Sequence, residues 1–283
     1  MNDEGLVDES DRANGLRKDL AEAMYDIKPK FLRCPGGNNI EGQSVSTRWK
    51  WWETLGPLEK RPGRVGDWGY YNTDGLGLME YLYWCEDMEM EPLLAVYAGY
   101  SLDGTSYPLS HMDEVLEEVL GELEFCLGDV STKWGAYRAE LGHPEPFAIR
   151  YVEVGNEDFF SSTYPYRFNY LYPALKQAYP DITFLSTAYN ENANGSDNPY
   201  SNYTIDLPSN SGWDYHIYSA SLAFLPVVIL VVANFRPHLT SSIHSTPGTT
   251  GPKTTIILGR TSRWSWENTG SYDFQTPSSQ LIC

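Results

Sequence analysis

The sequence predicts an α/β protein built around a parallel β-sheet, because short apolar runs alternate along the chain with stretches of helical periodicity. Five apolar runs are separated mostly by such helical stretches. This alternation is typical of either an open doubly wound sheet or an eight-stranded barrel, and the pattern alone does not choose between them. The expected strands cover residues 30–34, 92–97, 147–155, 182–185 and 213–218.

The amino-terminal part of the chain predicts two pairs of a helix and a strand. In the first pair, a helix precedes the strand 30–34, which stops at a Pro-Gly-Gly sequence. In the second pair, Asp74 is placed to cap a helix, and the strand 92–97 follows it. The apolar stripes of these two helices are Leu16, Leu20, Met24 and Ile27, and Leu78, Tyr81, Leu82 and Cys85.

Two further helices and three strands complete the series. Asp113 opens a helix with valines and leucines on one side, which leads to the strand 147–155. A helix around residues 170–175 leads to the strand 182–185, and the run 213–218 is the last strand. The regular alternation therefore ends at residue 218.

The composition indicates a folded protein that does not bind polyanions. Of the 283 residues, 41% are hydrophobic and 14% are aromatic, which is ample for a core. The formal net charge of −18 disfavours nucleic acid and anionic membranes as partners and suits a neutral ligand such as a sugar. Four cysteines are too few for a disulfide framework, so Cys85 and Cys126 are expected as buried thiols. No spacing of metal ligands is present, and we expect neither a metal nor a cofactor.

Both ends of the chain differ from its middle. The first fifteen residues are acidic and polar and do not have the pattern of a signal peptide. Residues 219–283 hold two acidic and four basic residues, whereas residues 1–218 carry a net charge of −20. The apolar run 220–233 is shorter than the roughly 20 residues of a membrane helix, and the Ser/Thr/Pro-rich stretch after it has no regular period. We therefore expect an irregular tail.

The stretch VEVGNEDFF carries the first candidate for catalysis. Alternation places Glu153 and Glu157 on the face opposite to Val152 and Val154, so the acids point toward a barrel axis if the valines meet the helices. Barrel enzymes keep catalytic groups at the carboxyl ends of their strands. A lone glutamate is more often a solvent-exposed loop residue, but Asn156 can bind a substrate hydroxyl and hold the neighbouring carboxyl, which favours a site.

Two more polar pairs lie at the ends of expected strands. His216 and Tyr218 share one face of the last strand, although a single histidine is more often a satisfied core residue. Arg33 and Asn38 flank two glycines that permit either a plain tight turn or the close approach of a ligand. Together these pairs indicate a polar site at one edge of the sheet.

Several blocks of the sequence resemble the catalytic barrel of fungal α-L-arabinofuranosidases of glycoside hydrolase family 51. The resemblance runs in collinear order over residues 14–218. It implies a (β/α)8 barrel, incomplete here and limited to about strands two to six, and an extracellular enzyme that hydrolyses terminal α-L-arabinofuranosyl groups of arabinan or arabinoxylan with retention. The blocks are LRCPGGNNIEG, GPLEKRPGRVGDWGYYNTDGLGLMEYL, EPLLAVYAGYSLDGTS, LGHPEPFAIRYVEVGNEDFF and WDYHIY.

The resemblance also implies a role for each candidate residue. Glu157 matches the general acid/base, which protonates the leaving oxygen and then takes a proton from water, so a raised pKa is expected for it. The substrate-binding residues implied in the same way are Arg33, Asn38, Asn156, His216 and Tyr218.

The nucleophile that the resemblance implies does not follow residue 218. A retaining enzyme needs a second carboxylate about 5–5.5 Å from the acid/base, and the family keeps it in a Gly-Glu-Tyr segment at the seventh strand. In another frame, codons for residues 266–269 can encode Gly-Glu-Tyr, so we hypothesise that residues 219–283 come from a retained intron or a frameshift. The sequence thus predicts a partial catalytic domain at 14–218 that is inactive as written. A carbohydrate-binding pseudoenzyme, a truncated gene-model product and another barrel glycosidase are the alternatives.

Overall fold

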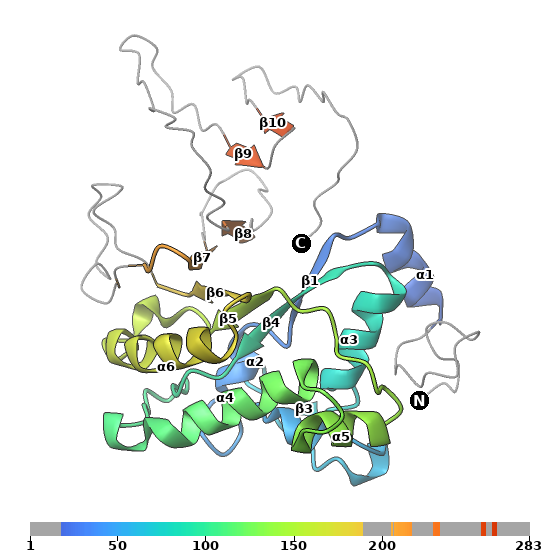
Figure 1. Ribbon diagram of the computed structural model, residues 1–283, viewed down its shortest axis with the longest axis horizontal. Helices are drawn as coiled ribbons and strands as arrows, with labels where there is room; N and C mark the ends of the chain where they lie inside the picture. The colour runs from blue at the N-terminus through green and yellow to red at the C-terminus, as the bar shows by residue number, and fades with distance from the viewer. Residues whose placement is uncertain are drawn as a thin grey trace. The chain divides into compact units, whose positions relative to one another are not determined.

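A mixed β-sheet is the centre of the fold. The computed structural model describes residues 18–188, 205 and 207–216, together with three short strands farther along the chain. The sheet has the strand order β1-β4-β5-β6-β7-β8, and its first five strands run parallel (Figure 1). The predicted five-stranded parallel α/β architecture is therefore confirmed. The five strands are β1 (Phe31–Cys34), β4 (Glu91–Val96), β5 (Tyr151–Val154), β6 (Thr183–Ser186) and β7 (Gly212–His216).

The middle of the sheet is buried on both faces. Strand β4 lies between β1 and β5, with Leu94 opposite Cys34 on one side and Val152 on the other. All three of these residues are at most 1% exposed. Strands that are covered on both faces appear in a sequence as continuous apolar runs, and this is why these segments are recognisable without long-range information.

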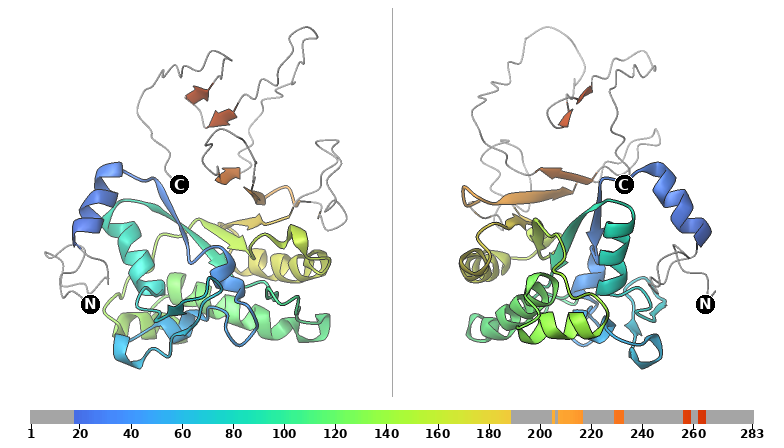
Figure 2. Two further views of the ribbon diagram at one scale, coloured as in Figure 1. Left: turned by 180° about the vertical axis from the view of Figure 1, so that it is seen from behind. Right: turned by 45° about the vertical axis from the view of Figure 1, so that its right-hand side comes forward.

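Helices connect the parallel strands and cover the sheet (Figures 1 and 2). The first connection holds α3, the second holds α4 and α5, and the third holds α6. Their apolar sides meet the strands in one main core, as the alternation in the sequence predicts. The bounds are α3 (Leu78–Asp87), α4 (Met112–Leu127), α5 (Lys133–Glu140) and α6 (Tyr164–Ala178).

The first helix, α1 (Lys18–Ile27), is present as predicted, but only part of the predicted apolar stripe is covered. Ala21 is 3% exposed and packs in a second, smaller core cluster, with Met24 against it. Leu20 and Ile27 are 47% and 36% exposed. Because α1 contacts its neighbours along the line of Ala21 and Met24, the other half of the stripe faces outward.

The long connection from β1 to α3 contains elements that the sequence pattern did not predict. It holds a two-stranded antiparallel hairpin of β2 (Arg64–Val65) and β3 (Tyr71–Asn72). A single short turn of helix also precedes each of α4 and α6. The remaining short elements are α2 (Asn38–Glu41), η1 (Trp51–Thr54), η2 (Leu58–Lys60), η3 (Leu109–His111) and η4 (Asp158–Phe160).

Three short strands fall within residues 219–283, for which an irregular tail is predicted. β8 (Ile229–Val232) pairs with β7 in the antiparallel sense, so a strand of opposite direction extends the sheet at that edge. β9 (Ile256–Leu258) and β10 (Ser262–Trp264) form an antiparallel pair of their own, in a separate unit covering residues 235–282. The other residues of the predicted tail lie outside the described part of the chain, and its origin from an intron or a frameshift stays a prediction.

Two further expectations concern the thiols and the membrane. Cys85 and Cys126 are free and buried, as predicted, and Cys34 is a third buried thiol. Among the helices of the described segments, none combines the length and the apolar composition needed to cross a bilayer.

Candidate active site

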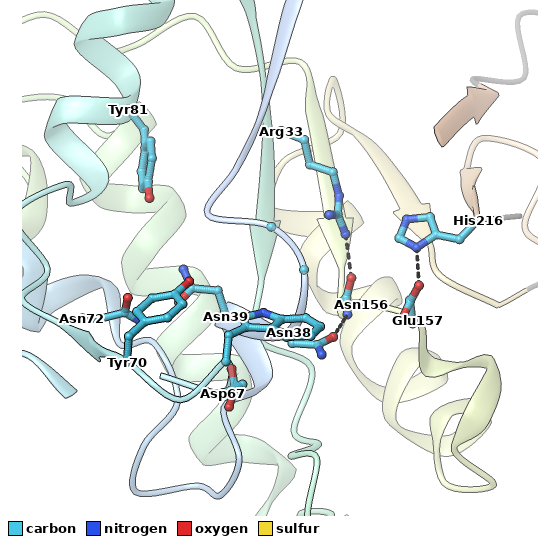
Figure 3. A pocket seen from close by; sticks show the side chains of 13 residues that line it. Arg33, Asn38, Asn39, Asp67, Tyr70, Asn72, Tyr81, Asn156, Glu157 and His216 are labelled. Carbon is cyan, nitrogen blue, oxygen red and sulfur yellow. Dashed lines mark hydrogen bonds and ion pairs between the residues drawn. The ribbon is translucent and has the colours of Figure 1, made fainter. Parts of the chain in front are cut away.

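Polar side chains meet at the carboxyl end of the parallel strands. Arg33 comes from β1, Glu153 from β5, and Asp214 and His216 from β7. Because all these strands run in the same direction, their carboxyl ends lie at one edge of the sheet, which is where ligands bind in α/β proteins. A cavity of about 430 Å³ opens there (Figure 3). Its lining residues are Arg33, Gly36, Gly37, Asn38, Asn39, Asp67, Trp68, Tyr70, Asn72, Tyr81, Asn156, Glu157 and His216.

Arg33 is the centre of a buried network. Its Nε and Nη2 atoms donate to the two carboxyl oxygens of Glu153 at 2.5 and 2.6 Å, and Nη2 also donates to Oδ1 of Asn156 at 2.8 Å. Asp214 lies 3.5 Å from the same Nη2 atom. Although burial alone would lower it, the acids around Arg33 raise the pKa of the guanidinium, so Arg33 keeps its positive charge.

His216 contacts a carboxylate with each ring nitrogen. Its Nδ1 atom lies 2.7 Å from Glu157 Oε1 (Figure 3). Its Nε2 atom lies 2.7 Å from Asp214 Oδ2. Burial opposes the charged imidazolium, but the hydrogen bonds to Asp214 and Glu157 outweigh it and raise the pKa of His216 to about 9. At neutral pH His216 is therefore a cation that donates to both acids.

The two buried acids beside Arg33 differ in the direction of their pKa shifts. Complete burial raises the pKa of Glu153 to about 8, and Arg33 counteracts this only in part. Burial also acts to raise the pKa of Asp214, but hydrogen bonds from His216 and Glu153 hold it below its usual value. Arg33 and His216 thus lie against the two carboxyl groups, an arrangement that keeps cations next to acids.

A strained turn after β5 presents Glu157 to the cavity. Gly155 has a φ of 93°, and a Cβ atom there would lie 1.9 Å from Asp158 Oδ2, so no larger residue fits. Glu157 itself adopts left-handed backbone angles, with φ 46° and ψ 28°, which are rare for residues other than glycine, asparagine and aspartate. Its side chain remains 18% exposed and reaches His216.

The buried side chain of Asp158 stabilises this turn through hydrogen bonds. Its Oδ1 atom accepts from Arg167 Nη2 at 2.6 Å, and both side chains are fully buried. Its Oδ2 atom accepts from the backbone N–H of Asn156 at 3.1 Å and from Thr187 Oγ1 at 3.2 Å. The buried pair therefore stabilises the backbone of the residues on either side of Glu157.

The glycines after β1 allow the chain to pass close to the cavity. Gly36 and Gly37 both have positive φ, at 65° and 62°. A Cβ atom on Gly36 would lie 3.0 Å from Nη1 of Arg33, whereas one on Gly37 would meet nothing within 4 Å. Gly36 is thus constrained by the packing against Arg33, while Gly37 borders the open space.

The structure brings five of the six predicted site residues together. Tyr218 lies outside the described residues. The positions of the others agree with the prediction of one site at the edge of the sheet, while their catalytic and binding roles stay predictions. The five that line the same cavity are Arg33, Asn38, Asn156, Glu157 and His216.

Sequence reasoning missed several members of the site. Asp214 shares the face of His216 by the same alternation that paired His216 with residue 218, so this signal was available. The hairpin residues had no such signal, because their position depends on how the long connection folds over the sheet. Trp68 and Tyr70 are 73% and 58% exposed at the cavity, and Asp67 also lines it.

Glu157 is the one glutamate among the lining residues that the structure describes, and Asp67 on the hairpin is the other lining carboxylate. Glu153 does not line the cavity, and its carboxyl oxygens accept hydrogen bonds from Arg33. The described part of the chain therefore supplies a proton-transfer group, several hydrogen-bonding groups and exposed aromatic rings. Exposed aromatic rings beside hydrogen-bonding groups suit a ligand that has both apolar and polar surfaces.

Comparison with known proteins identifies relatives of this chain. Residues 23–228 match a family described as the α-L-arabinofuranosidase 1 domain. A probable α-L-arabinofuranosidase A of Aspergillus terreus is 48% identical over 214 residues, which cover 74% of this chain and 33% of the relative. An α-L-arabinofuranosidase A of Aspergillus niger is 41% identical over 265 residues, which cover 91% of this chain and 38% of the relative. The chain thus spans about a third of the length of these relatives.

Solved structures give the same result. The arabinose-bound MgGH51 α-L-arabinofuranosidase is 51% identical, with a TM-score of 0.62 over 66% of this chain and 30% of that one. The α-L-arabinofuranosidase of Thermotoga maritima, solved as an arabinose complex, is 27% identical, with a TM-score of 0.50 over 62% of this chain and 34% of that one. In both comparisons, the similarity covers about a third of the larger protein.

Proposed function

Since the chain belongs to the α-L-arabinofuranosidases of glycoside hydrolase family 51, we propose that its cavity binds a terminal, non-reducing α-L-arabinofuranosyl group of an arabinose-containing polysaccharide or oligosaccharide. The observation that carries this proposal is the network in which Arg33, Asn156, Glu157 and His216 meet at the carboxyl end of the parallel strands. The presence of arabinose in two of the similar structures supports it.

The proposal extends to the architecture. The five parallel strands would correspond to the second to sixth strands of a (β/α)8 barrel. Their consecutive order from β1 to β7 and the position of the cavity at their carboxyl ends support this correspondence.

Within this proposal, Glu157 is the group that moves a proton. In the first step of a retaining hydrolysis it would give a proton to the leaving oxygen, and in the second it would take one from water. Its contact with His216 fixes the direction of its carboxyl group at the cavity. Arg33 and Asn156 would orient the sugar, because each is already held by the buried network and loses little freedom on binding.

Binding without hydrolysis is the second candidate function. The observation in its favour is that, among the described residues, the cavity lining holds one carboxylate besides Glu157, and this is Asp67 on the hairpin rather than a carboxylate from a parallel strand. A retaining mechanism needs a second carboxylate about 5–5.5 Å from the acid/base. A pseudoenzyme of this kind would keep the sugar-binding groups and not turn the substrate over.

One pair of measurements tests both candidates. Calorimetric titration with L-arabinose and an arabino-oligosaccharide measures binding, and release of L-arabinose from the same oligosaccharide, whose leaving group is not activated, measures hydrolysis. Hydrolysis that is lost in Glu157→Gln and kept in the exposed-helix control Glu117→Gln supports the hydrolase. Binding with no release supports the pseudoenzyme. Absence of both binding and release contradicts the proposal.

A further inference from the structure

A second buried glutamate, Glu41, lies outside the cavity lining and contacts the site through Asn156. Glu41 is the last residue of α2 and is 3% exposed. Its Oε2 atom accepts a hydrogen bond from Asn156 Nδ2 at 3.0 Å. Glu41 is not among the residues that line the cavity, so any effect on a bound sugar must pass through the residues above it.

The carboxamide of Asn156 has a hydrogen-bond donor of a neighbour next to its oxygen and acceptors of two neighbours next to its nitrogen. Its Oδ1 atom accepts from Arg33 Nη2 at 2.8 Å, and its Nδ2 atom donates to Asn38 Oδ1 at 3.4 Å (Figure 3). The same Nδ2 atom donates to Glu41. A rotation of the amide by 180° would set its oxygen against the acceptors of Glu41 and Asn38 and its NH2 group against a donor of Arg33. The observed orientation is therefore the one that satisfies all three neighbours.

The orientation of Asn156 in turn sets that of Asn38. Because Asn38 Oδ1 accepts from Asn156, the NH2 group of Asn38 is the part of that side chain left to face the cavity as a donor. Of the two acceptors that fix Asn156, Glu41 makes the shorter hydrogen bond, and its side chain is more deeply buried.

The backbone around Glu41 is held firmly. Ser101 Oγ donates to the carbonyl oxygen of Glu41 at 2.8 Å. Gly42 follows with a φ of 63°, and a Cβ atom there would lie 2.4 Å from the backbone of Arg48. These contacts fix the end of α2, so the carboxyl group of Glu41 has little freedom to follow Asn156 if that side chain turns.

Glu41 also adds little negative charge beside Glu157. Burial raises the pKa of Glu41 to about 9, and the nearby acids Asp158 and Glu157 act in the same direction. At neutral pH the carboxyl group is protonated, so a glutamine has nearly the same shape, charge and hydrogen-bond acceptor. This similarity provides a conservative variant with which to test the role of the group.

We infer that Glu41 is a positioning residue: its buried carboxyl oxygen holds the Asn156 amide in the orientation that leaves the NH2 group of Asn38 as a donor for sugar binding. This inference rests on the proposed arabinofuranosyl-binding function. It assigns to α2 a part in recognition although Glu41 does not itself line the cavity.

The test compares three variants by calorimetric titration with an arabino-oligosaccharide. Glu41→Leu removes the acceptor and is expected to weaken binding at least about tenfold, because one amide loses the partner that orients it. Glu41→Gln keeps an acceptor and is expected to bind within about twofold of the natural chain. The control Glu122→Leu makes the same substitution at a glutamate of α4 that is 2% exposed and does not line the cavity. It is expected to leave the affinity unchanged.

Equal affinity of Glu41→Leu and the natural chain would overturn the inference, and so would a Glu41→Gln variant as weak as Glu41→Leu. A natural chain that binds no arabinoside would contradict the proposed function itself. Nuclear magnetic resonance of the Asn156 side-chain NH2 group, assigned with Asn156→Asp, then decides the inference without any ligand. Slow hydrogen exchange in the natural chain and Glu41→Gln, with fast exchange in Glu41→Leu, is expected, and equal exchange rates in all three would overturn it.

Discussion

Gly155 shows how one residue controls the presentation of the candidate acid/base. It directly follows β5 and has a positive φ, and the carboxylate of Asp158 occupies the space that a Cβ atom would need. That carboxylate also accepts from the Asn156 backbone and from Arg167. The conformation of the turn, the buried ion pair and the direction of Glu157 are therefore coupled through a single position that has no side chain.

Gly155→Ala is expected to destabilise the protein by about 2–4 kcal/mol, because the added methyl group meets a buried oxygen and the alanine must adopt a left-handed conformation. Gly104→Ala is the matched control. Gly104 has a φ of 87°, but nothing lies within 4 Å of an added Cβ atom, so a cost of about 1 kcal/mol is expected. Denaturant unfolding of both variants measures the difference, and equal costs would contradict this account.

Trp68 is expected to contribute to binding of sugars beyond the terminal arabinose. It is 73% exposed on the hairpin and lines the cavity together with Tyr70, and sugar rings stack readily on such aromatic faces. Trp68→Ala should weaken binding of an arabino-oligosaccharide by about 1–2 kcal/mol and leave binding of L-arabinose nearly unchanged. Val65→Ala, an exposed position on the same hairpin that does not line the cavity, is the control. Equal losses for the two ligands would contradict a separate binding position for the second sugar.

The carboxyl end of α4 is held by a buried cation rather than by a capping glycine alone. The side chain of Arg138, on α5, is fully buried and donates only to backbone carbonyls. Two of these belong to the end of α4, where unpaired carbonyls carry a partial negative charge. The acceptors are the carbonyl oxygens of Phe125 at 2.6 Å, Gly128 at 2.8 Å, and His143 and Pro144 at 2.9 Å each.

Arg138→Met keeps most of the aliphatic volume but removes all four donors. We expect it to lower the free energy of unfolding by about 3–5 kcal/mol, since four carbonyl oxygens, that of Phe125 buried and the others partly buried, would lose their partner. Arg150→Met is the matched control. Arg150 pairs with Glu91, but its side chain is 72% exposed, so a loss below about 1 kcal/mol is expected. A similar loss in the two variants would show that the carbonyl contacts of Arg138 do not stabilise α4 and α5.

The pH dependence of the domain follows from groups that hold protons more tightly when folded. The pKa of His216 is raised to about 9, that of Glu153 to about 8 and that of Glu41 to about 9. Between the ordinary values of these groups and their folded values, the folded state binds more protons than the unfolded state. The free energy of unfolding must therefore fall as the pH rises through this interval.

Each group has its own part of this interval. The raised pKa values of Glu153 and Glu41 contribute stability that is lost from about pH 4.5 upward, because these carboxyls ionise first in the unfolded chain. For His216, the contribution is complete below about pH 6.5 and is lost as the pH approaches 9. Asp214 has the opposite effect: its lowered pKa contributes stability at neutral pH, and this contribution is lost only when the pH falls into the acid range. We expect the melting temperature to be highest near pH 5 and to decrease toward pH 9, with a shallower decrease in Glu41→Gln. A melting temperature that rises over this range would contradict the protonation states assigned to the site.

Much of the fold could be predicted because the signals are local. Apolar runs such as that around Leu94 record burial on both faces of a parallel sheet, and helical spacing records one covered side. The same alternation placed Glu157 and His216 at strand ends, and parallel strands place their ends together. The five strands and five residues of the site were therefore within reach of the sequence, whereas the order of the strands in the sheet was not.

The remaining features depend on contacts between distant parts of the chain. Arg33 meets Glu153 across 120 residues, and Asn156 meets Glu41 across 115 residues. Such partners are decided by strand register and by the packing of loops over the sheet, neither of which has a periodic signature. The pKa of His216 depends on the same neighbours. The residue types and their strand positions were thus set by local pattern. Which groups touch, which are charged and which half of the α1 stripe is covered were decided only when the distant segments came together.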